Sequence, residues 1–449
     1  MLLKARTFFC FLGIISGSAL LAEGEAMASE RTGADAVLKL TLDEALERVG
    51  EQNPLILFNR EGVRQALEQT FRDRAQLFPQ VSLRASQDRR RSARSFAGGA
   101  AQPFTINTFD LKLDGSIAII DSQNYANFRI SEIAYQIRQR DFEGVMEDFL
   151  EQTATLYFQQ LRDKARIELI ESTIERDRQL LQLTRDQLDA GVATAIDVTR
   201  AEVRIAREER ALIQQVAVAR ASRERLKALL DVPADTSLQL VDPLLEEERL
   251  SAPDKGIMRD QHSLVLQRPE LLGTRLQLDQ ARLARRAAAW QRLPTVELFG
   301  NIGYETARAF DSDMERGWLV GIRASVPIFE GFRIQAEKRQ ADAAIRANEF
   351  LLRDLENNLT RDYQIALSEV DSRFQQLPIA DKEVALAKEE LRLARDRFTQ
   401  GVADNRELID AQQALASAED GLLEARFFYG LSRVAFARVV GAVRAESIQ

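Results

Sequence analysis

The sequence predicts a mainly α-helical protein that also forms a β-barrel, built from a duplicated unit of two strands and a very long helical hairpin. Three observations predict this fold: an internal repeat, two pairs of alternating strand patterns, and two helical stretches that are unusually long. A duplicated unit of this length builds one structure from two quasi-equivalent halves, unlike the short units of stacked repeat proteins. We therefore expect one elongated body within the 449 residues.

The repeat is clearest near the ends of the two long helical stretches. Residues 183–193, LTRDQLDAGVA, return as residues 393–403, LARDRFTQGVA. Nearer the start of each half the offset grows from about 210 to about 215 residues, since Phe78-Pro79 matches Leu293-Pro294. This difference predicts one loop that is longer by about five or six residues in the first half.

The first 28 residues have the three parts of a secretory signal peptide. Lys4 and Arg6 form a basic start, residues 8–21 form an apolar run, and residues 26–28 (AMA) fit a small-x-small cleavage site. The run is short for a membrane span, so an uncleaved anchor is the weaker alternative. We predict cleavage after Ala28.

Composition argues against several kinds of site. The only cysteine, Cys10, lies in the predicted signal, and the only histidine, His262, reads as a helix start or a surface residue. We therefore expect no disulfide, no metal site and no cofactor. A net charge of −8 argues against nucleic acid as a partner. Without a nucleophile–base constellation or a Gly-rich phosphate loop, we expect no enzyme.

In the first half, residues 41–44 (TLDE) predict a capping-box helix start, and Asn53-Pro54 predicts a second start. That helix should end at Phe78-Pro79. An arginine-rich stretch, Arg89–Arg94, then reads as an outward-facing loop between two strands. In the second of these strands apolar and polar residues alternate, as in Phe109, Asp110, Leu111, Lys112, Leu113 and Asp114.

The second half repeats this alternation around Val296–Tyr304 and Trp318–Val326. Strands of about 9–11 residues suit an outer-membrane barrel that is apolar outside and polar inside, and Tyr304 and Trp318 suit an interfacial aromatic belt. A strand face packed on a soluble core is the alternative. Because four strands cannot close a barrel and open edges are not tolerated in lipid, several chains must share it; three would supply twelve strands.

Residues 122–190 contain no proline and only one glycine, Gly144, which predicts a helix of roughly 100 Å. Its charge excludes a membrane span, and its apolar spacing is coiled-coil-like. Residues 332–400 copy it, with a kink or break near Pro378. The predicted organisation is a signal peptide (1–28), a first repeat (29–230, with strands 80–120 and hairpin 122–230), a connector (231–260) that forms a small side domain, and a second repeat (261–449, with strands 295–328 and hairpin 331–440).

In order and duplicated, several short motifs resemble the TolC family of outer-membrane efflux proteins. They are the helix starts Asn53-Pro54 and Arg268-Pro269-Glu270, the turns Phe78-Pro79 and Leu293-Pro294 before strands, the strand exit Val326–Gly331, and the two Gly-Val-Ala tips, followed four residues later by Asp197 and Glu407. The resemblance covers nearly the whole mature chain.

This resemblance implies a homotrimer with a twelve-stranded barrel in the outer membrane of a Gram-negative bacterium, continuous with a twelve-helix periplasmic α-barrel. Its function would be the passive exit duct of a tripartite efflux or type I secretion system. Its partners would be an inner-membrane pump, a periplasmic adaptor (membrane fusion protein) and outer-membrane lipid. The alternative from another class is a periplasmic coiled-coil scaffold or adaptor without a pore.

The resemblance also implies the site residues. The adaptor-docking tips would be Gly191, Val192, Ala193, Gly401, Val402 and Ala403; a plain helix C-cap is the simpler interpretation of each glycine. The periplasmic entrance and gate would use Asp197, Phe398, Glu407 and Asp410, whose acids otherwise read as a solvated helix face. The family's gate tyrosine and arginine are replaced here by Phe398 and Ala403, so Arg395, Arg397 and Arg406 are candidate partners for neighbouring acids.

Overall fold

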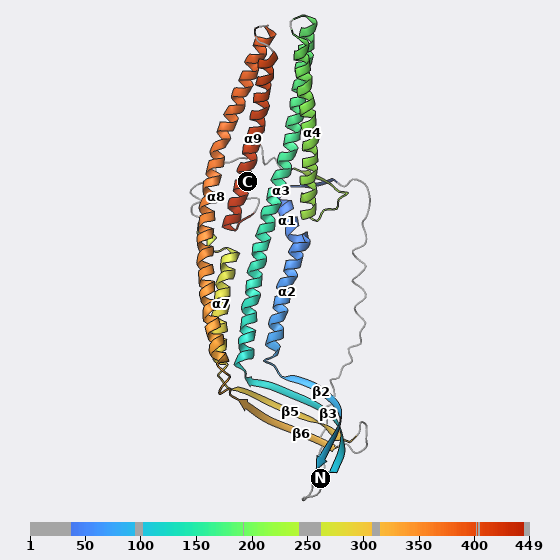
Figure 1. The fold of residues 1–449 in the computed structure, drawn as a ribbon, viewed down its shortest axis with the longest axis vertical. Helices are drawn as coiled ribbons and strands as arrows, with labels where there is room; N and C mark the ends of the chain where they lie inside the picture. Colours follow the sequence, from blue (N-terminus) through green and yellow to red (C-terminus); the bar gives the residue numbers. More distant parts are fainter. Residues whose placement is uncertain are drawn as a thin grey trace, which may run out of the picture.

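The computed structural model describes residues 37–94, 102–191, 193–241, 262–307, 315–400, 402 and 405–443. The molecule is elongated (Figure 1): a four-stranded sheet lies at one end, long helices rise from it, and two helical hairpins end in separate tips at the other end. The predicted signal peptide and most of the connector lie outside the described residues.

The two halves have matching elements. In the first half they are β1 (Val37–Leu40), α1 (Leu42–Gln52), α2 (Pro54–Ala75), β2 (Gln80–Arg94), β3 (Gln102–Ile120), α3 (Ser122–Asp189) and α4 (Ala195–Leu229). The connector contributes β4 (Ser237–Leu240). In the second half they are α6 (His262–Val265), α7 (Pro269–Trp290), β5 (Thr295–Thr306), β6 (Glu315–Ser325), α8 (Arg333–Thr399) and α9 (Asn405–Val440).

Both predicted helix starts in the first half are confirmed. The N–H of Glu44 donates to Thr41 Oγ1 at 3.3 Å, and the N–H of Thr41 donates to Glu44 Oε2 at 2.8 Å, which completes the capping box. Asn53 Oδ1 accepts from the N–H groups of Leu55 and Ile56 and so caps α2. These contacts satisfy backbone donors that a helix leaves unpaired at its start.

Helices α3 and α8 have 68 and 67 residues, as the absence of breaking residues predicts. A break at Pro378 is not found, since α8 continues through it. Proline removes one backbone hydrogen bond, but the neighbouring Leu377 is buried in a cluster with Tyr429 of α9. Tertiary packing therefore holds the helix together at this position.

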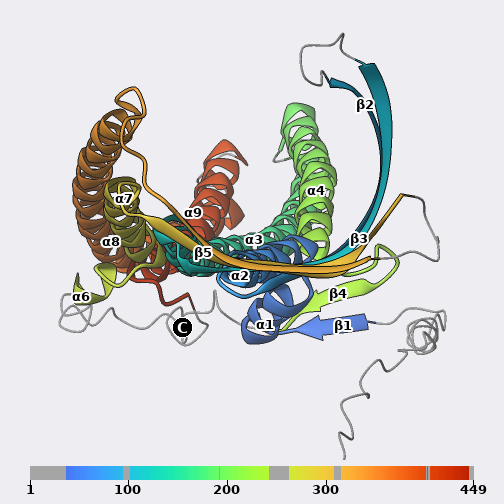
Figure 2. The same ribbon diagram turned by 90° about the horizontal axis from the view of Figure 1, so that it is seen from below.

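The four long strands form one antiparallel sheet in the order β2-β3-β5-β6, so β3 and β5 join the two halves. Figure 2 shows that the sheet is curved. One row across it consists of Leu83, Leu113, Ile302 and Trp318, paired in that order. Trp318 is 74% exposed, so this apolar face is uncovered in the single chain.

Two strands of the first half are longer than predicted: β2 has 15 residues and β3 has 19. The expected loop at Arg89–Arg94 is wrong, because these residues belong to β2; Arg89 pairs with Asn107 and Arg91 with Thr105. The extra residues of the first half therefore extend the β2–β3 hairpin instead of enlarging a loop. Continued pairing satisfies those backbone donors and acceptors that face the partner strand of the hairpin.

A waist of packed side chains lies where α1, the connector and the ends of α4 and α9 meet α3. Its largest apolar cluster includes Leu42, Val49, Tyr157, Leu226 and Val434. Strand β4 pairs with β1 in parallel beside α1 (Figure 2), a pair that the sequence did not predict because four-residue strands carry too little alternation. None of the described helices is long and apolar enough to cross a membrane.

Candidate functional site

The first hairpin tip is closed by a glycine C-cap. Gly191 has a φ of +74°, which a residue with a Cβ adopts only with strain. Its N–H donates to the carbonyl of Leu188 at 2.9 Å, and the N–H of Ala193 donates to the carbonyl of Gln187 at 3.2 Å. These bonds satisfy carbonyls at the end of α3, so Gly191 is a helix cap. Val192 lies outside the described residues.

Asp197 is engaged by the start of its own helix, α4. Its Oδ2 accepts from the N–H of Thr194 at 3.0 Å and from the Thr194 hydroxyl, while Oδ1 lies 3.5 Å from Arg200 Nη1. The hydrogen bonds from Thr194, chiefly that of its side chain, lower the pKa of Asp197. The carboxylate is therefore charged at neutral pH and closes a capping box.

The second tip exposes a valine. Val402 is 68% exposed, and its N–H donates to the carbonyl of Arg397 at 2.9 Å. The other two tip residues named from the sequence, Gly401 and Ala403, lie outside the described residues. An apolar side chain held at the end of a long charged hairpin is suited to contact with another protein.

Phe398 is only 4% exposed and lies inside the second hairpin. Its cluster contains Leu408 and Ala411 of α9 and also Leu180 of α3, so the ring packs where the two hairpins meet. Within one chain, Phe398 thus belongs to an apolar cluster that the second tip shares with the first hairpin.

The two acids named for the entrance are paired with arginines. Glu407 Oε1 lies 3.2 Å from Arg397 Nε, and Asp410 Oδ2 lies 3.9 Å from Arg406 Nε. The pairing suggested for Arg397 and Arg406 is therefore confirmed, whereas Arg395 forms no ion pair with a described residue. Both pairs are exposed to solvent, so water and salt weaken them.

Below the tips, the arginine of a buried ion pair within the first hairpin also reaches the second hairpin. Arg204 Nε of α4 donates to Asp177 Oδ2 of α3 at 2.8 Å, and Arg204 Nη1 donates to the carbonyl of Ile409 in α9 at 3.0 Å. Burial raises the pKa of Asp177, although the guanidinium of Arg204 opposes this shift. The sequence did not single out either side chain, since an arginine or an aspartate on a long helix usually faces water.

Further along, three arginines of α3 face acids of α9, which adds polar contacts between the hairpins. The pairs are Arg162–Glu424, Arg166–Asp420 and Arg176–Glu419. Their side chains are half-buried, so they are screened less than the pairs at the second tip. The α3–α9 contact is consequently both ionic and apolar, the apolar part being the cluster that joins Leu180 of α3 to Leu408 and Ala411 of α9.

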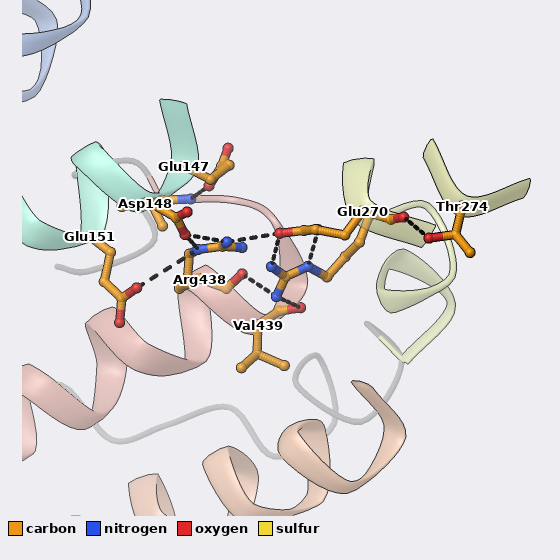
Figure 3. A network of polar contacts seen from close by, with 9 residues as sticks. Glu147, Asp148, Glu151, Glu270, Thr274, Arg438 and Val439 are labelled. Atoms are coloured by element: carbon orange, nitrogen blue, oxygen red, sulfur yellow. Dashed lines mark hydrogen bonds and ion pairs between the residues drawn. The ribbon is translucent and has the colours of Figure 1, made fainter. Parts of the chain in front are cut away.

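At the waist, Arg438 of α9 joins three elements (Figure 3). Its Nε donates to Asp148 Oδ1 of α3 at 3.0 Å, its Nη2 donates to Glu270 Oε1 of α7 at 2.8 Å, and Nε lies 3.7 Å from Glu151 Oε2. Arg268 binds Glu270 through two nitrogens, at 2.7 and 3.0 Å, and donates to carbonyls at the end of α9. This network connects both halves of the repeat.

Carboxylates outnumber guanidinium groups in this network. Burial is the largest cause that raises the pKa of Glu151 and of Glu270, and the charge of Asp148 adds to both shifts. For Glu151 the guanidinium of Arg438 opposes the shift. Arg438 and Arg268 are thus the two cations that offset the charge of these acids at the waist.

No cluster of metal-ligating side chains occurs among the described residues. What the geometry offers instead is a scaffold: a curved sheet with an apolar face, two long hairpins fixed to each other, and capped tips. A model of the outer membrane efflux protein family matches residues 45–231 and 262–442, which are the two halves of the repeat. This chain belongs to the outer membrane efflux protein family. The predicted resemblance to TolC proteins is confirmed.

Relatives and solved structures agree with this membership. The outer membrane protein TolC of Vibrio cholerae is 20% identical over 426 residues, covering 93% of this chain and 94% of that protein. The toluene efflux pump outer membrane protein TtgC of Pseudomonas putida is 24% identical over 397 residues, covering 82% and 76%. The CmeC outer membrane channel of Campylobacter jejuni has the same fold, with a TM-score of 0.77 at 18% identity over 89% of this chain and 85% of that one.

As a member of this family, the chain is an outer-membrane efflux channel with a large periplasmic portion. The predicted location and class of function are confirmed, and the scaffold without a pore is set aside. The family comprises transport proteins and is not a class of enzymes.

Proposed function

We propose that three copies of this chain form one channel, with a shared twelve-stranded barrel in the outer membrane and a twelve-helix periplasmic tunnel. The observation that carries this proposal is the open sheet: the outer edges of β2 and β6 have no partner strand in the described part of the chain. Unpaired backbone groups are costly in lipid. Pairing β2 of one copy with β6 of the next removes both edges, and three copies give an even strand number.

The polarity of the two sheet faces supports this orientation. The row Leu83–Leu113–Ile302–Trp318 would face lipid. On the opposite face, Lys112 pairs with Asp110 and Glu305, and Arg323 pairs with Glu297. Charged pairs of this kind suit a water-filled lumen.

In this assembly the chain would be a passive duct for cargo handed over by an inner-membrane pump and a periplasmic adaptor. The six tip residues (Gly191, Val192, Ala193, Gly401, Val402 and Ala403) would contact the adaptor, a role supported by the exposed Val402 and the capped Gly191. Asp197, Glu407 and Asp410 would line the periplasmic entrance, with Phe398 anchoring the tip beside it. The name of TtgC, an efflux pump outer membrane protein, is in keeping with this role.

Cysteine crosslinking between β2 and β6 tests the shared barrel. The only native cysteine is Cys10, in the predicted signal, so the mature chain should offer a clean background. Ser82→Cys combined in turn with Leu319→Cys, Arg323→Cys or Ser325→Cys should give covalent dimers and trimers on oxidation, because the strands of neighbouring copies would lie about 5 Å apart. Non-reducing electrophoresis reads out the ladder.

The matched control is Ser116→Cys with Arg323→Cys, since β3 and β6 are separated by β5 in the same sheet. This pair should give monomer only. Monomer from every β2–β6 pair as well would reject the shared barrel.

A further inference from the structure

We propose that the outer end of the β2–β3 hairpin binds the phosphate groups of glycolipids in the outer leaflet, through Arg89 and Arg91. We call this end the ribbon: residues 87–94 of β2 and residues 102–108 of β3. The inference goes beyond export and rests on the outward orientation of the proposed barrel.

The ribbon extends past the rest of the sheet. The pairing of β3 with β5 stops at Phe109 and Thr306, whereas β2 stays paired with β3 as far as Arg94 and Gln102. Figure 2 shows β2 and β3 sweeping beyond β5 and β6. Seven further residues of β3 reach roughly 24 Å past that point. Since the opposite ends of the strands join the periplasmic helices, the ribbon lies on the exterior side.

Strand alternation places Arg89 and Arg91 on the lipid-facing side. Every second residue of a strand lies on the same face, and Gln87, Arg89 and Arg91 are four, six and eight residues after Leu83 in β2. Their partners on β3 are Asn107 and Thr105, which follow Phe109. The arginines therefore begin about 7 Å beyond the last aromatic residue of the apolar band, and Arg91 lies about 14 Å beyond it. Hydrocarbon gives way to headgroups at such a boundary.

The chemistry of this face suits a phosphate monoester or diester. Both guanidinium groups are exposed, and neither forms an ion pair with a described residue. A guanidinium can bind two phosphate oxygens at once. Arg316 adds a third exposed cation on the same face, opposite Tyr304, while the only acid of the ribbon, Asp88, lies on the other face.

The same geometry favours a lipid over a free anion. The apolar band directly below the arginines, at Phe109 and Leu111, offers a surface for acyl chains, so an amphipathic ligand contacts both regions at once. Long arginine side chains at this depth can extend toward the headgroups. Outer-leaflet glycolipids that carry phosphate combine these two features.

Native mass spectrometry of the mature protein in detergent micelles tests the proposal with diphosphorylated lipid A as the probe. Arg89→Gln/Arg91→Gln should bind it about tenfold more weakly than the unchanged protein, a loss of about 1.4 kcal/mol. Arg90→Gln should stay within about twofold, because Arg90 lies on the opposite face of the same strand. Removing the phosphates from lipid A should weaken its binding to the unchanged protein by the same factor. Loss of the phosphates and loss of the two arginines should therefore have equal effects.

Equal binding by the unchanged protein and the double variant would overturn the proposal, and so would equal binding of lipid A with and without phosphates. Full displacement by millimolar inorganic phosphate would overturn the assignment to a lipid. Circular dichroism of each variant excludes misfolding as the cause of a loss. The β2–β6 crosslinks keep the two proposals apart: a normal ladder without phosphate selectivity rejects only this inference, whereas no ladder in any pair rejects the shared barrel.

Discussion

Arg438 shows how one side chain can hold a long protein together at its waist. It is mostly buried, and it contacts Asp148, Glu151 and Glu270 from two other helices. Burial raises the pKa of Glu151 and of Glu270. The guanidinium of Arg438 opposes this shift at Glu151, while Glu270 is also paired with Arg268. Removing the cation leaves like charges facing one another.

Arg438→Met should therefore destabilise the protein by about 1.5–3 kcal/mol at pH 7.5, the range for hydrogen bonds to charged groups, because the acids that it contacts are 33–63% exposed. Without the cation, the pKa of Glu151 rises further, because the charge of Arg438 lowers it in the folded protein. A carboxyl whose folded pKa lies above its unfolded value destabilises the fold when ionised, and this penalty fades as the pH falls through the folded pKa. Thermal unfolding at pH 7.5 and 5.0 should show a smaller deficit at the lower pH.

The matched control is Arg406→Met on the same helix, whose partner Asp410 is 72% exposed. It should change the free energy of unfolding by less than about 1 kcal/mol at either pH. An Arg438→Met variant that unfolds like the control would mean that the waist network is stabilised by other contacts.

At the scale of elements, the hairpins depend on how their tips are closed. A 68-residue helix and its 35-residue partner can be antiparallel only if the chain reverses within a few residues. Gly191 ends α3 and the Thr194–Asp197 capping box begins α4 almost at once. The reversal of the chain at the first tip therefore depends on local hydrogen bonds.

Asp197→Ala should weaken the start of α4 by about 1 kcal/mol, because the N–H of Thr194 loses its acceptor. Hydrogen exchange at the amides of residues 194–198 should quicken while exchange in the middle of α4 stays unchanged. Hydrogen bonding lowers the pKa of Asp197 below the ordinary 3.8, so the difference from the unchanged protein should persist above that pH and disappear below the folded pKa. Asp197→Asn, which keeps an acceptor, should lie in between; unchanged exchange in Asp197→Ala would contradict the capping role.

At the scale of the whole molecule, the proposed trimer would gather three copies of each acid of the second tip around one opening. Each of these acids also has an arginine beside it, Arg397 for Glu407 and Arg406 for Asp410. The net electrostatic potential at the opening is therefore the negative contribution of the acids offset by the positive contribution of the arginines. Selectivity for cations should therefore be modest and adjustable in both directions.

Glu407→Gln/Asp410→Asn should lower the cation-to-anion permeability ratio about twofold in planar bilayers, because the remaining arginines leave the opening more positive. Arg397→Gln is the control of opposite sign and should raise the ratio. If the cation-to-anion permeability ratio is unchanged in both variants, these acids lie on an ordinary solvated helix face and do not line the entrance.

Much of the fold could be predicted from the sequence. The capping box at Thr41, the proline start after Asn53 and the lengths of α3 and α8 depend on residues close together in the chain, and each was found as expected. The predicted loop at Arg89–Arg94 was wrong, since alternation in β2 is weak beyond Ala85 and only pairing with β3 shows that the strand continues.

The sequence by itself determined the repeat, the helix starts and the alternation of the strands, because these depend on periodicity and on hydrogen bonds between near neighbours. Only the tertiary structure decided the parallel pairing of β1 with β4, the burial of Phe398 and the link from Arg204 to Asp177 and Ile409. Those contacts join segments far apart in the chain. Their partners depend on how the hairpins lie against each other, which no local pattern encodes.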